Sequence, residues 1–297
     1  MLIRRMRPSL GSILVIVLRV AAGYRPGVTI SDADLAIAAA LAGADVVRAR
    51  FGTPLPRYAK SATDFATAAD IEAERAILGV ISAARPGDAL VGEESGRTGE
   101  ATRTWLVDPL CGTLNFAAET TLVAVNVALR DGPTVVAAAA ADPFTGEVFW
   151  TDGTAAHVRR DGVDAPLAPT GLSRLVDVNL DPPFPNDPAF RAARLLTEPD
   201  FVARFGPRVV SSTLAVTWVA AGRRAAYVSD TDIRDSVHFA AGVAICRAAG
   251  CVVTGLRGQP VDEGVKGLVV AADADTHAAL LALIGRQFTG SGGPGRA

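Results

Sequence analysis

Cysteine, histidine and lysine are all scarce in this chain of 297 residues. It has three cysteines, three histidines and only two lysines, Lys60 and Lys266. An odd and sparse set of cysteines argues against the disulfide framework of a small secreted protein. We therefore expect a protein of the reducing cytoplasm.

An excess of charge of one sign is also missing. The 29 basic and 31 acidic residues leave a net charge of −2, which gives no overall basic field for nucleic acid or anionic lipid. The apolar run from Ile13 to Leu18 is followed by Arg19 and is far shorter than the roughly 20 residues of a membrane-spanning helix. We expect no nucleic-acid or membrane partner, and we interpret residues 1–27 as an N-terminal extension rather than a signal peptide.

Hydrophobic periodicity divides the rest of the chain into two halves. In residues 28–160, helices at 35–51 and 70–84 come before a meander of strands; in residues 161–285, helices and strands alternate. The expected strands are 89–91, 105–107, 122–129, 135–140, 147–151, 155–159, 225–229, 252–254 and 268–271, and the later helices are 214–221, 239–249 and 274–284. This order predicts an α+β half followed by an α/β half, with a seam near 145–170. We expect the glycine-rich residues 286–297 to form a flexible tail.

Acidic residues gather at three places where predicted elements begin or end. These are Thr67 to Asp70, the sequence Gly-Glu-Glu-Ser at 92–95, and the segment from Asp108 to Thr113. Carboxylates mounted on such loops suit Mg²⁺, and the backbone amides of Gly112 and Thr113 suit an anion. Each motif also has an ordinary structural explanation, as a helix cap, a solvated turn or an Asp-Pro turn. Their succession in one chain favours a functional site.

Several of these segments together resemble the inositol monophosphatase family. The resemblance is carried by TDFATAAD (63–70), VGEESG (91–96), WLVDPLCGTLNF (105–116), VAVNVAL (123–129) and DPFTGEVFW (142–150), and it covers about residues 30–285. It implies a layered α-β-α-β-α sandwich, a phosphate-monoester substrate, two or three Mg²⁺ ions and a metal-activated water. Members of this family often form dimers, so a homodimer is also expected.

The resemblance also assigns roles to individual residues of this chain. Glu93, Asp108 and the Leu110 carbonyl fall on metal ligands. Asp70 and Thr113 fall on the pair that orients the attacking water, and the amides of Gly112 and Thr113 are expected to hold the phosphate. Further candidates for the substrate wall are Ser211 and Asp235.

Two positions depart from the family pattern on the same metal ion. Cys111 and His238 stand where the family has aspartates, and thiol and imidazole are poor ligands for Mg²⁺. The chain could therefore keep a single Mg²⁺, bind a softer ion such as Zn²⁺ at the second position, or use Cys111 and His238 as a reactive pair. Asp235 is a candidate replacement carboxylate for the altered site.

Three functions remain open at this point. The first is hydrolysis of a sugar, cyclitol or nucleotide-type phosphate. The second is a different reaction on a specialised metabolite, with Cys111 and His238 as the reactive groups. The third is a non-catalytic binding protein of the same fold, because a fold alone does not fix a function.

Overall fold

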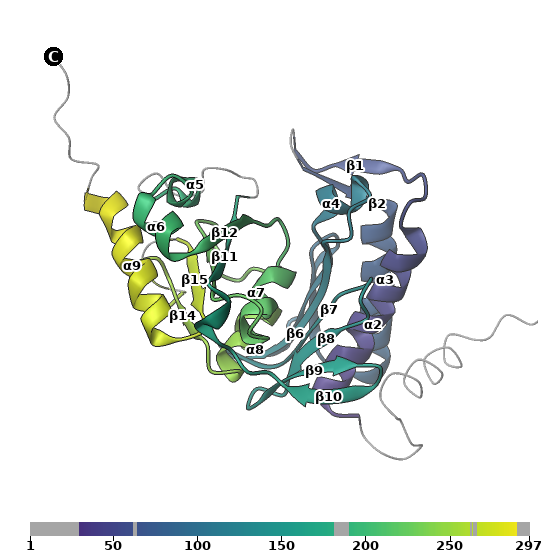
Figure 1. The fold of residues 1–297 in the computed structure, drawn as a ribbon. Coiled ribbons are helices and arrows are strands. Elements are labelled where there is room, and N and C mark those ends of the chain that lie inside the picture. The colour runs from purple at the N-terminus through teal and green to yellow at the C-terminus, as the bar shows by residue number, and fades with distance from the viewer. Residues whose placement is uncertain (1–29, 62–63, 181–189, 262, 264–265, 290–297) are drawn as a thin grey trace, which may run out of the picture.

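Two β-sheets and three layers of helices form a sandwich, which Figure 1 shows from the side. The computed structural model describes residues 30–61, 64–180, 190–261, 263 and 266–289. The expected N-terminal extension 1–27 lies outside these described residues. No helix within the described part of the chain is both long and apolar enough to cross a membrane.

The first half places two helices against an eight-stranded sheet. Helix α2 covers Asp32–Arg50 and is capped by Ser31, whose side chain accepts a hydrogen bond from the Asp34 amide. Helix α3 covers Ala68–Ala84. The sheet has the order β10-β9-β8-β7-β6-β5-β3-β4. Its strands are β3 (Ala89–Gly92), β4 (Gly96–Thr98), β5 (Arg103–Cys111), β6 (Ala124–Asp131), β7 (Thr134–Ala141), β8 (Val148–Thr151), β9 (Ala156–Arg160) and β10 (Val163–Pro166). A separate hairpin pairs β1 (Arg57–Ala59) with β2 (Phe65–Thr67), and the short helix α4 covers Thr113–Ala117.

The second half contains a mixed five-stranded sheet of order β12-β11-β13-β15-β14. Strand β11 pairs in parallel with β12 and β13, whereas β15 pairs antiparallel with β13 and β14. The strands are β11 (Leu175–Asn179), β12 (Gly206–Val209), β13 (Ala226–Ser229), β14 (Val252–Thr254) and β15 (Leu268–Ala271). The helices are α5 (Ala192–Leu195), α6 (Pro199–Arg204), α7 (Leu214–Ala220), α8 (Ala240–Ala248) and α9 (Ala274–Thr289).

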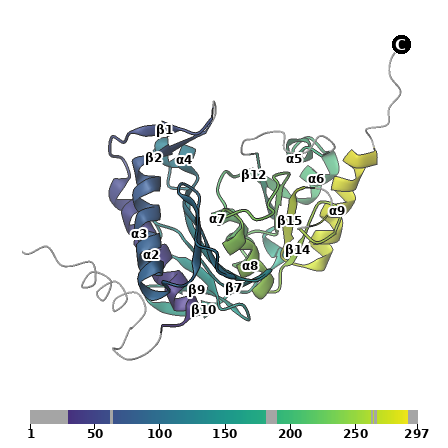
Figure 2. The same cartoon turned by 180° about the vertical axis from the view of Figure 1, so that it is seen from behind.

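The layers follow from three hydrophobic cores. The first lies between α2, α3 and the eight-stranded sheet, the second around α7 and α8 between the two sheets, and the third between the five-stranded sheet and α5, α6 and α9. Figure 2 shows the same order from behind. The predicted α-β-α-β-α arrangement is therefore confirmed.

Strand β7 shows why its alanine run suits this position. Ala137, Ala139 and Ala141 face the first core, while Ala138 and Ala140 face the second. Because successive side chains of a strand point to opposite faces, both faces of β7 are lined by small groups. Helices can therefore approach the sheet closely from both sides.

Several boundaries differ from those expected from sequence, and three of them bear on the site or on the division into halves. Strand β5 continues through Pro109 to Cys111, because a bulge accommodates the proline. Strand β10 extends the first sheet to Pro166, which is past residue 160 but within the seam expected near 145–170. Helix α9 runs to Thr289, and residues 286–289 of the expected tail are helical; the rest of that tail lies outside the described residues.

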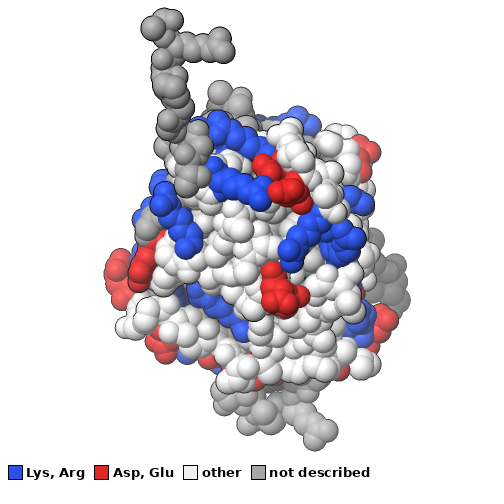
Figure 3. All heavy atoms as spheres, turned by 60° about the vertical axis from the view of Figure 1, so that its left-hand side comes forward, with Lys and Arg blue, Asp and Glu red and all other residues white. Residues whose placement is uncertain are grey.

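Surface charge is mixed on the face turned forward in Figure 3. Basic and acidic side chains form small mixed groups there, and uncharged surface lies between the groups. This face therefore carries no continuous field of one sign, as the near balance of 29 basic and 31 acidic residues leads one to expect.

Candidate active site

A bulge in strand β5 sets the position of the central carboxylate. Asp108 pairs with Asn126 of β6, whereas Cys111 pairs with Ala124, so two residues of β5 face one residue of β6. Proline lacks the N–H needed by a regular ladder, and a bulge is one of the few places in a sheet that tolerates it. The sequence Asp-Pro-Leu-Cys thus places a fully buried Asp108 and the partly exposed Cys111 at the C-terminal end of β5, an interior strand of the sheet.

Asp108 is surrounded by hydrogen-bond donors. Its Oδ1 accepts from the Leu110 amide at 3.1 Å. Its Oδ2 accepts from Asn126 Nδ2 at 3.4 Å and lies 2.8 Å from Nδ1 of His238. Burial alone would raise the pKa of Asp108, but the charge and hydrogen bond of His238 hold it below its usual range.

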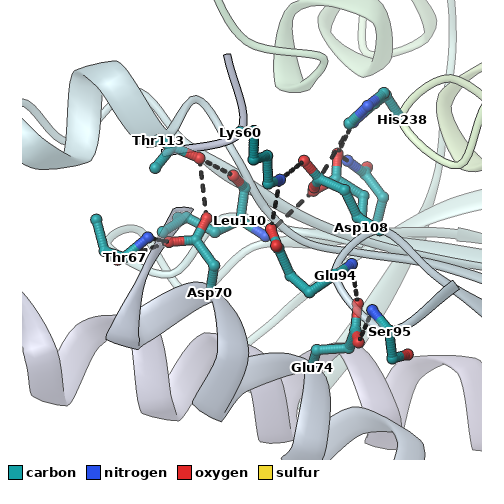
Figure 4. A network of polar contacts seen from close by, with 12 residues as sticks. Lys60, Thr67, Asp70, Glu74, Glu94, Ser95, Asp108, Leu110, Thr113 and His238 are labelled. Atoms are coloured by element: carbon teal, nitrogen blue, oxygen red, sulfur yellow. Dashed lines mark hydrogen bonds and ion pairs between the residues drawn. The ribbon is translucent and has the colours of Figure 1, made fainter. Parts of the chain in front are cut away.

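His238 brings the second half of the molecule to this site. In Figure 4 it extends from the C-terminal half toward Asp108, which lies on the first sheet. Burial alone would lower the pKa of His238, but Asp108, followed by Glu93, raises it to about 9. In the absence of a metal ion, an imidazolium therefore balances the buried Asp108 carboxylate.

Glu93 forms the other acidic wall, and Lys60 lies against it. Lys60 Nζ donates to Glu93 Oε1 at 2.7 Å and to Glu94 Oε1 at 2.6 Å, while Glu93 Oε2 is 3.9 Å from His238 Nδ1. Burial and the charge of Asp108 raise the pKa of Glu93 to about 8. Burial tends to lower the pKa of Lys60, but its bonds to the two glutamates raise it above its usual range. Lys60 and His238 are thus the cationic groups that contact Glu93 and Asp108.

The loop that carries Glu93 is fixed from below by Glu74 of helix α3. The Glu74 carboxylate accepts from the amides of Glu94 at 2.8 Å and Ser95 at 2.9 Å (Figure 4). A Cβ at Gly92 would lie 2.5 Å from that carboxylate. The glycine therefore permits the close approach through which a buried glutamate positions the acidic loop.

Asp70 and Thr113 form a second polar group in the first half. Thr67 caps helix α3, and its amide and hydroxyl donate to Asp70 Oδ2 at 2.8 and 2.6 Å. Thr113 Oγ1 lies 2.9 Å from Asp70 Oδ1 and 3.2 Å from the Leu110 carbonyl oxygen. Burial raises the pKa of Asp70, although these hydrogen bonds oppose the shift. Asp70 is thus both a cap residue and the partner of Thr113.

Of these groups, Glu93, Thr113 and His238 line one cavity of about 430 Å³. At its floor, Gly112 has φ +102°, and a Cβ there would lie 3.0 Å from the Leu122 carbonyl oxygen. Asn115 fixes the turn by donating to the carbonyl oxygens of Leu122 and Ser211 at 2.9 and 2.8 Å. The residues of the cavity wall include Asp64, Glu93, Leu110, Cys111, Gly112, Thr113, Ser211, Thr213 and His238.

The predicted ligands divide into two sets when tested against magnesium. Glu93, Asp108 and the Leu110 carbonyl offer the hard oxygen atoms that Mg²⁺ prefers, so this set fits it. Asp108, Cys111 and His238 offer oxygen, sulfur and nitrogen atoms that all lie within 4.8 Å of one another. This second set does not fit Mg²⁺.

The geometry also bears on a reactive Cys111–His238 pair. His238 directs Nδ1 to Asp108, and Cys111 Sγ accepts a hydrogen bond from the Thr213 amide at 3.3 Å. A base that activates a nucleophile needs a hydrogen bond to it. The described contacts of His238 thus favour a role with Asp108 over a role as the base for Cys111.

Asp235 is placed away from the metal-ligand candidates. Its exposed side chain forms an ion pair with Arg130 at 2.6 Å and lines a different cavity, of about 700 Å³. The backbone of Asp235 has φ +53°, which turns the segment before His238. The expected replacement of a metal ligand by Asp235 is therefore not seen in this arrangement.

Sequence reasoning missed four residues that shape the site: Lys60, Glu74, Asn126 and Thr213. Lys60 had a signal, because it is one of only two lysines in the chain. Glu74 follows Asp70 by one helical turn, a spacing that puts both on one face of α3. Asn126 and Thr213 carry no local signal, since they reach the site through sheet pairing and through the second half.

Comparison with known proteins gives a consistent family. The model of the inositol monophosphatase family matches residues 31–287. An inositol-1-monophosphatase of Caulobacter vibrioides is 31% identical over 247 residues, which cover 77% of this chain and 90% of that protein. One of Mycobacterium leprae is 35% identical over 260 residues, 84% of each chain.

Solved structures share the fold. The extragenic suppressor protein suhB of Bartonella henselae aligns with a TM-score of 0.75 and 25% identity, covering 84% of this chain and 97% of that one. The Thermotoga maritima IMPase aligns with a TM-score of 0.73 and 19% identity, covering 86% and 96%. From its matched residues, identities and fold, the chain belongs to the inositol monophosphatase family.

Proposed function

We propose that this protein hydrolyses the phosphate monoester of a small molecule, of the sugar, cyclitol or nucleotide type. The observation that carries the proposal is the Asp70–Thr113 hydrogen bond of 2.9 Å beside the carboxylates of Glu93 and Asp108. Family membership supports the same chemistry, because curated relatives are named inositol-1-monophosphatases. A cavity of about 430 Å³ is large enough for a phosphorylated ring.

The metal proposed for this site is a single Mg²⁺ on Glu93, Asp108 and the Leu110 carbonyl. When bound, such an ion polarises phosphate oxygens and lowers the pKa of a bound water. Lys60 and His238 must give up their contacts with Glu93 and Asp108 for those carboxylates to serve as ligands. At the second position, a softer ion such as Zn²⁺ is proposed in place of magnesium.

The proposed proton path uses Thr113 and Asp70. The Thr113 hydroxyl can accept a hydrogen from the attacking water while donating its own to Asp70 Oδ1. Burial raises the pKa of Asp70, which makes this carboxylate a better proton acceptor than an ordinary aspartate. The amides of Gly112 and Thr113 are proposed to hold the phosphate at the cavity floor.

A second candidate is a different reaction on a specialised metabolite. Its support is that Cys111 and His238 line the same cavity as Thr113. It predicts an activity that Cys111→Ser and His238→Ala abolish, without phosphate release. The shared cavity alone supports it less strongly than the intact Asp70–Thr113 pair supports hydrolysis.

The proposal is tested by phosphate release from a broad panel of monoesters with Mg²⁺, Mn²⁺ or Zn²⁺. We expect turnover of at least one member, abolished by Asp70→Asn. Absence of release with every substrate and metal would contradict hydrolysis. Ligand-induced thermal stabilisation without any turnover would instead indicate a binding protein.

A further inference from the structure

We infer that Asp108, Cys111 and His238 form a site for a thiophilic divalent cation with the chemistry of Zn²⁺. The family pattern places a second Mg²⁺ at this position, so the inference is a change of metal at one position of a shared fold. It deepens the proposed function and rests on it for the catalytic use of the ion. The binding of the ion itself rests only on the three side chains.

The distances suit a small tetrahedral centre. The ligand atoms of the three residues all lie within 4.8 Å of one another. Zinc bonds of about 2.0–2.3 Å to nitrogen, oxygen and sulfur place neighbouring ligand atoms roughly 3.5 Å apart. Asp108 Oδ2 and His238 Nδ1 are now 2.8 Å apart. Small side-chain rotations therefore convert a hydrogen-bonded pair and a nearby thiol into a ligand set.

A backbone amide of the second half is directed at the Cys111 sulfur. The Thr213 amide donates a hydrogen bond to Cys111 Sγ at 3.3 Å. An N–H group directed at sulfur stabilises its anionic form, as hydrogen bonds from a second layer of residues do around metal-bound ligands. Thr213 comes from the second half, as does His238. The site is therefore closed only when the two halves meet.

Asn126 adds an independent observation from the first sheet. Its side chain is 1% exposed, and its Oδ1 has no hydrogen-bond partner among the described residues. Its Nδ2 lies 2.8 Å from Thr213 Oγ1 and 3.4 Å from Asp108 Oδ2. Buried polar atoms are nearly always satisfied, so this oxygen calls for a further donor, such as a water molecule, next to a side chain that contacts Asp108.

The site resembles a catalytic zinc centre more than a structural one. It has three protein ligands of mixed type, and structural zinc is usually enclosed by four. Cys111 and His238 both line the cavity beside Thr113. A fourth position would therefore face the substrate space, where a water or phosphate oxygen can reach it.

The test is cobalt titration of the full chain, purified without added metal and then treated with a chelator. Co²⁺ takes zinc sites and reports a bound thiolate through a charge-transfer absorption in the near ultraviolet. We expect this band to saturate at one Co²⁺ per chain and to be displaced by Zn²⁺ but not by excess Mg²⁺. Cys111→Ser should remove the band and weaken Zn²⁺ binding by about a hundredfold or more.

Two further variants keep the outcome unambiguous. Cys251→Ala alters a buried cysteine of the second core and should leave the band unchanged. His238→Asn should keep the thiolate but weaken binding of Zn²⁺ at least tenfold. A band that survives Cys111→Ser, or Co²⁺ bound without any thiolate band, would overturn the assignment.

Failure of this inference and failure of the proposed function are distinguishable. Phosphate release with Mg²⁺ and no thiolate band would refute the thiophilic site alone. A saturating thiolate band with no phosphate release from the whole panel would refute hydrolysis and leave the metal site in place.

Discussion

The two sides of the candidate active site are built in different ways. One side consists of Thr67, Asp70 and Thr113, all from the first half, tied together by hydrogen bonds of 2.6 to 2.9 Å. The other consists of Asp108, Cys111 and His238, and it is completed only by a residue from the second half. We refer to them as the threonine–aspartate side and the cysteine–histidine side.

The difference shows which part of the site can change independently. The threonine–aspartate side is also a capping box of helix α3, so altering Asp70 would disturb both the helix start and Thr113. His238 has no such structural duty among its described contacts, which are to the Asp108 and Glu93 carboxylates. The ligand set on the cysteine–histidine side can therefore change while the Asp70–Thr113 hydrogen bond stays intact.

The largest effect is expected from Asp108→Asn, because this carboxylate belongs to both candidate ligand sets. Phosphate release with Mg²⁺ should fall by roughly a hundredfold to a thousandfold, the usual range for loss of one preorganised electrostatic group. Steady-state kinetics measures the loss. Asp200→Asn is the matched control, since Asp200 is exposed and pairs with Arg286, and it should keep its activity. Equal losses in both variants would contradict the role of Asp108.

Thr113→Ala separates the two sides. Removing the hydroxyl should lower kcat by about a hundredfold, the lower range for lost proton transfer, while the cobalt spectrum of the cysteine–histidine side stays unchanged. Thr113→Ser retains the hydroxyl next to Asp70 and should recover most of the rate. If Thr113→Ala changes metal binding as strongly as turnover, the two sides are not separate.

Glu74→Ala tests the support that links helix α3 to the acidic loop. The amides of Glu94 and Ser95 lose their acceptor, so the free energy of unfolding should fall by about 1–3 kcal/mol. Urea denaturation measures it, and the half-saturating Mg²⁺ concentration should rise because Glu93 is less well positioned. Glu72→Ala, on the same helix but paired with Arg50 near the surface, should cost less. An unchanged stability in Glu74→Ala would contradict this support.

The metal-free protein should also show a pH dependence of its stability. The pKa of His238, raised by Asp108 from 6.5 to about 9, makes the folded chain bind more protons than the unfolded chain over this interval. Stability should therefore fall as the pH rises through that range. Glu93, with its pKa raised from 4.5 to about 8, acts in the same direction.

Urea midpoints of the chelated protein at several pH values would show this slope. His238→Gln should reduce the loss of stability between pH 6.5 and about 9, whereas Thr113→Ala should leave this loss unchanged. A stability that rises between these pH values would show that the charge balance of the cysteine–histidine side is wrong.

Much of the fold could be predicted from two sources, local signals and the family resemblance. The strands at 252–254 and 268–271 follow from local patterns and agree with the structure, and the layered arrangement implied by the resemblance is confirmed. Strands β11 and β12 were not predicted, since β12 contains Gly206 and Pro207, which weaken the strand pattern. The sequence predicts only residues 105–107 of strand β5, because Pro109 signals a turn and the bulge depends on pairing with β6.

The candidate site could be predicted only as far as its motifs reach. The segments around Asp70, Glu93 and Asp108 contain their own signals, and the structure brings these three residues into one polar network. The contacts of Lys60, Asn126 and Thr213 cross between elements far apart in the chain. Such contacts depend on tertiary packing, which no local pattern encodes.

We propose that Cys111 and His238 weaken Mg²⁺ binding at a site that otherwise carries the groups needed for phosphate hydrolysis. The double variant Cys111→Asp/His238→Asp, assayed for Mg²⁺-dependent phosphate release beside the unaltered chain, tests this proposal. Two added carboxylates should lower the half-saturating Mg²⁺ concentration at least tenfold, about 1.4 kcal/mol of binding free energy, and raise turnover. An unchanged Mg²⁺ dependence with unchanged turnover would refute it.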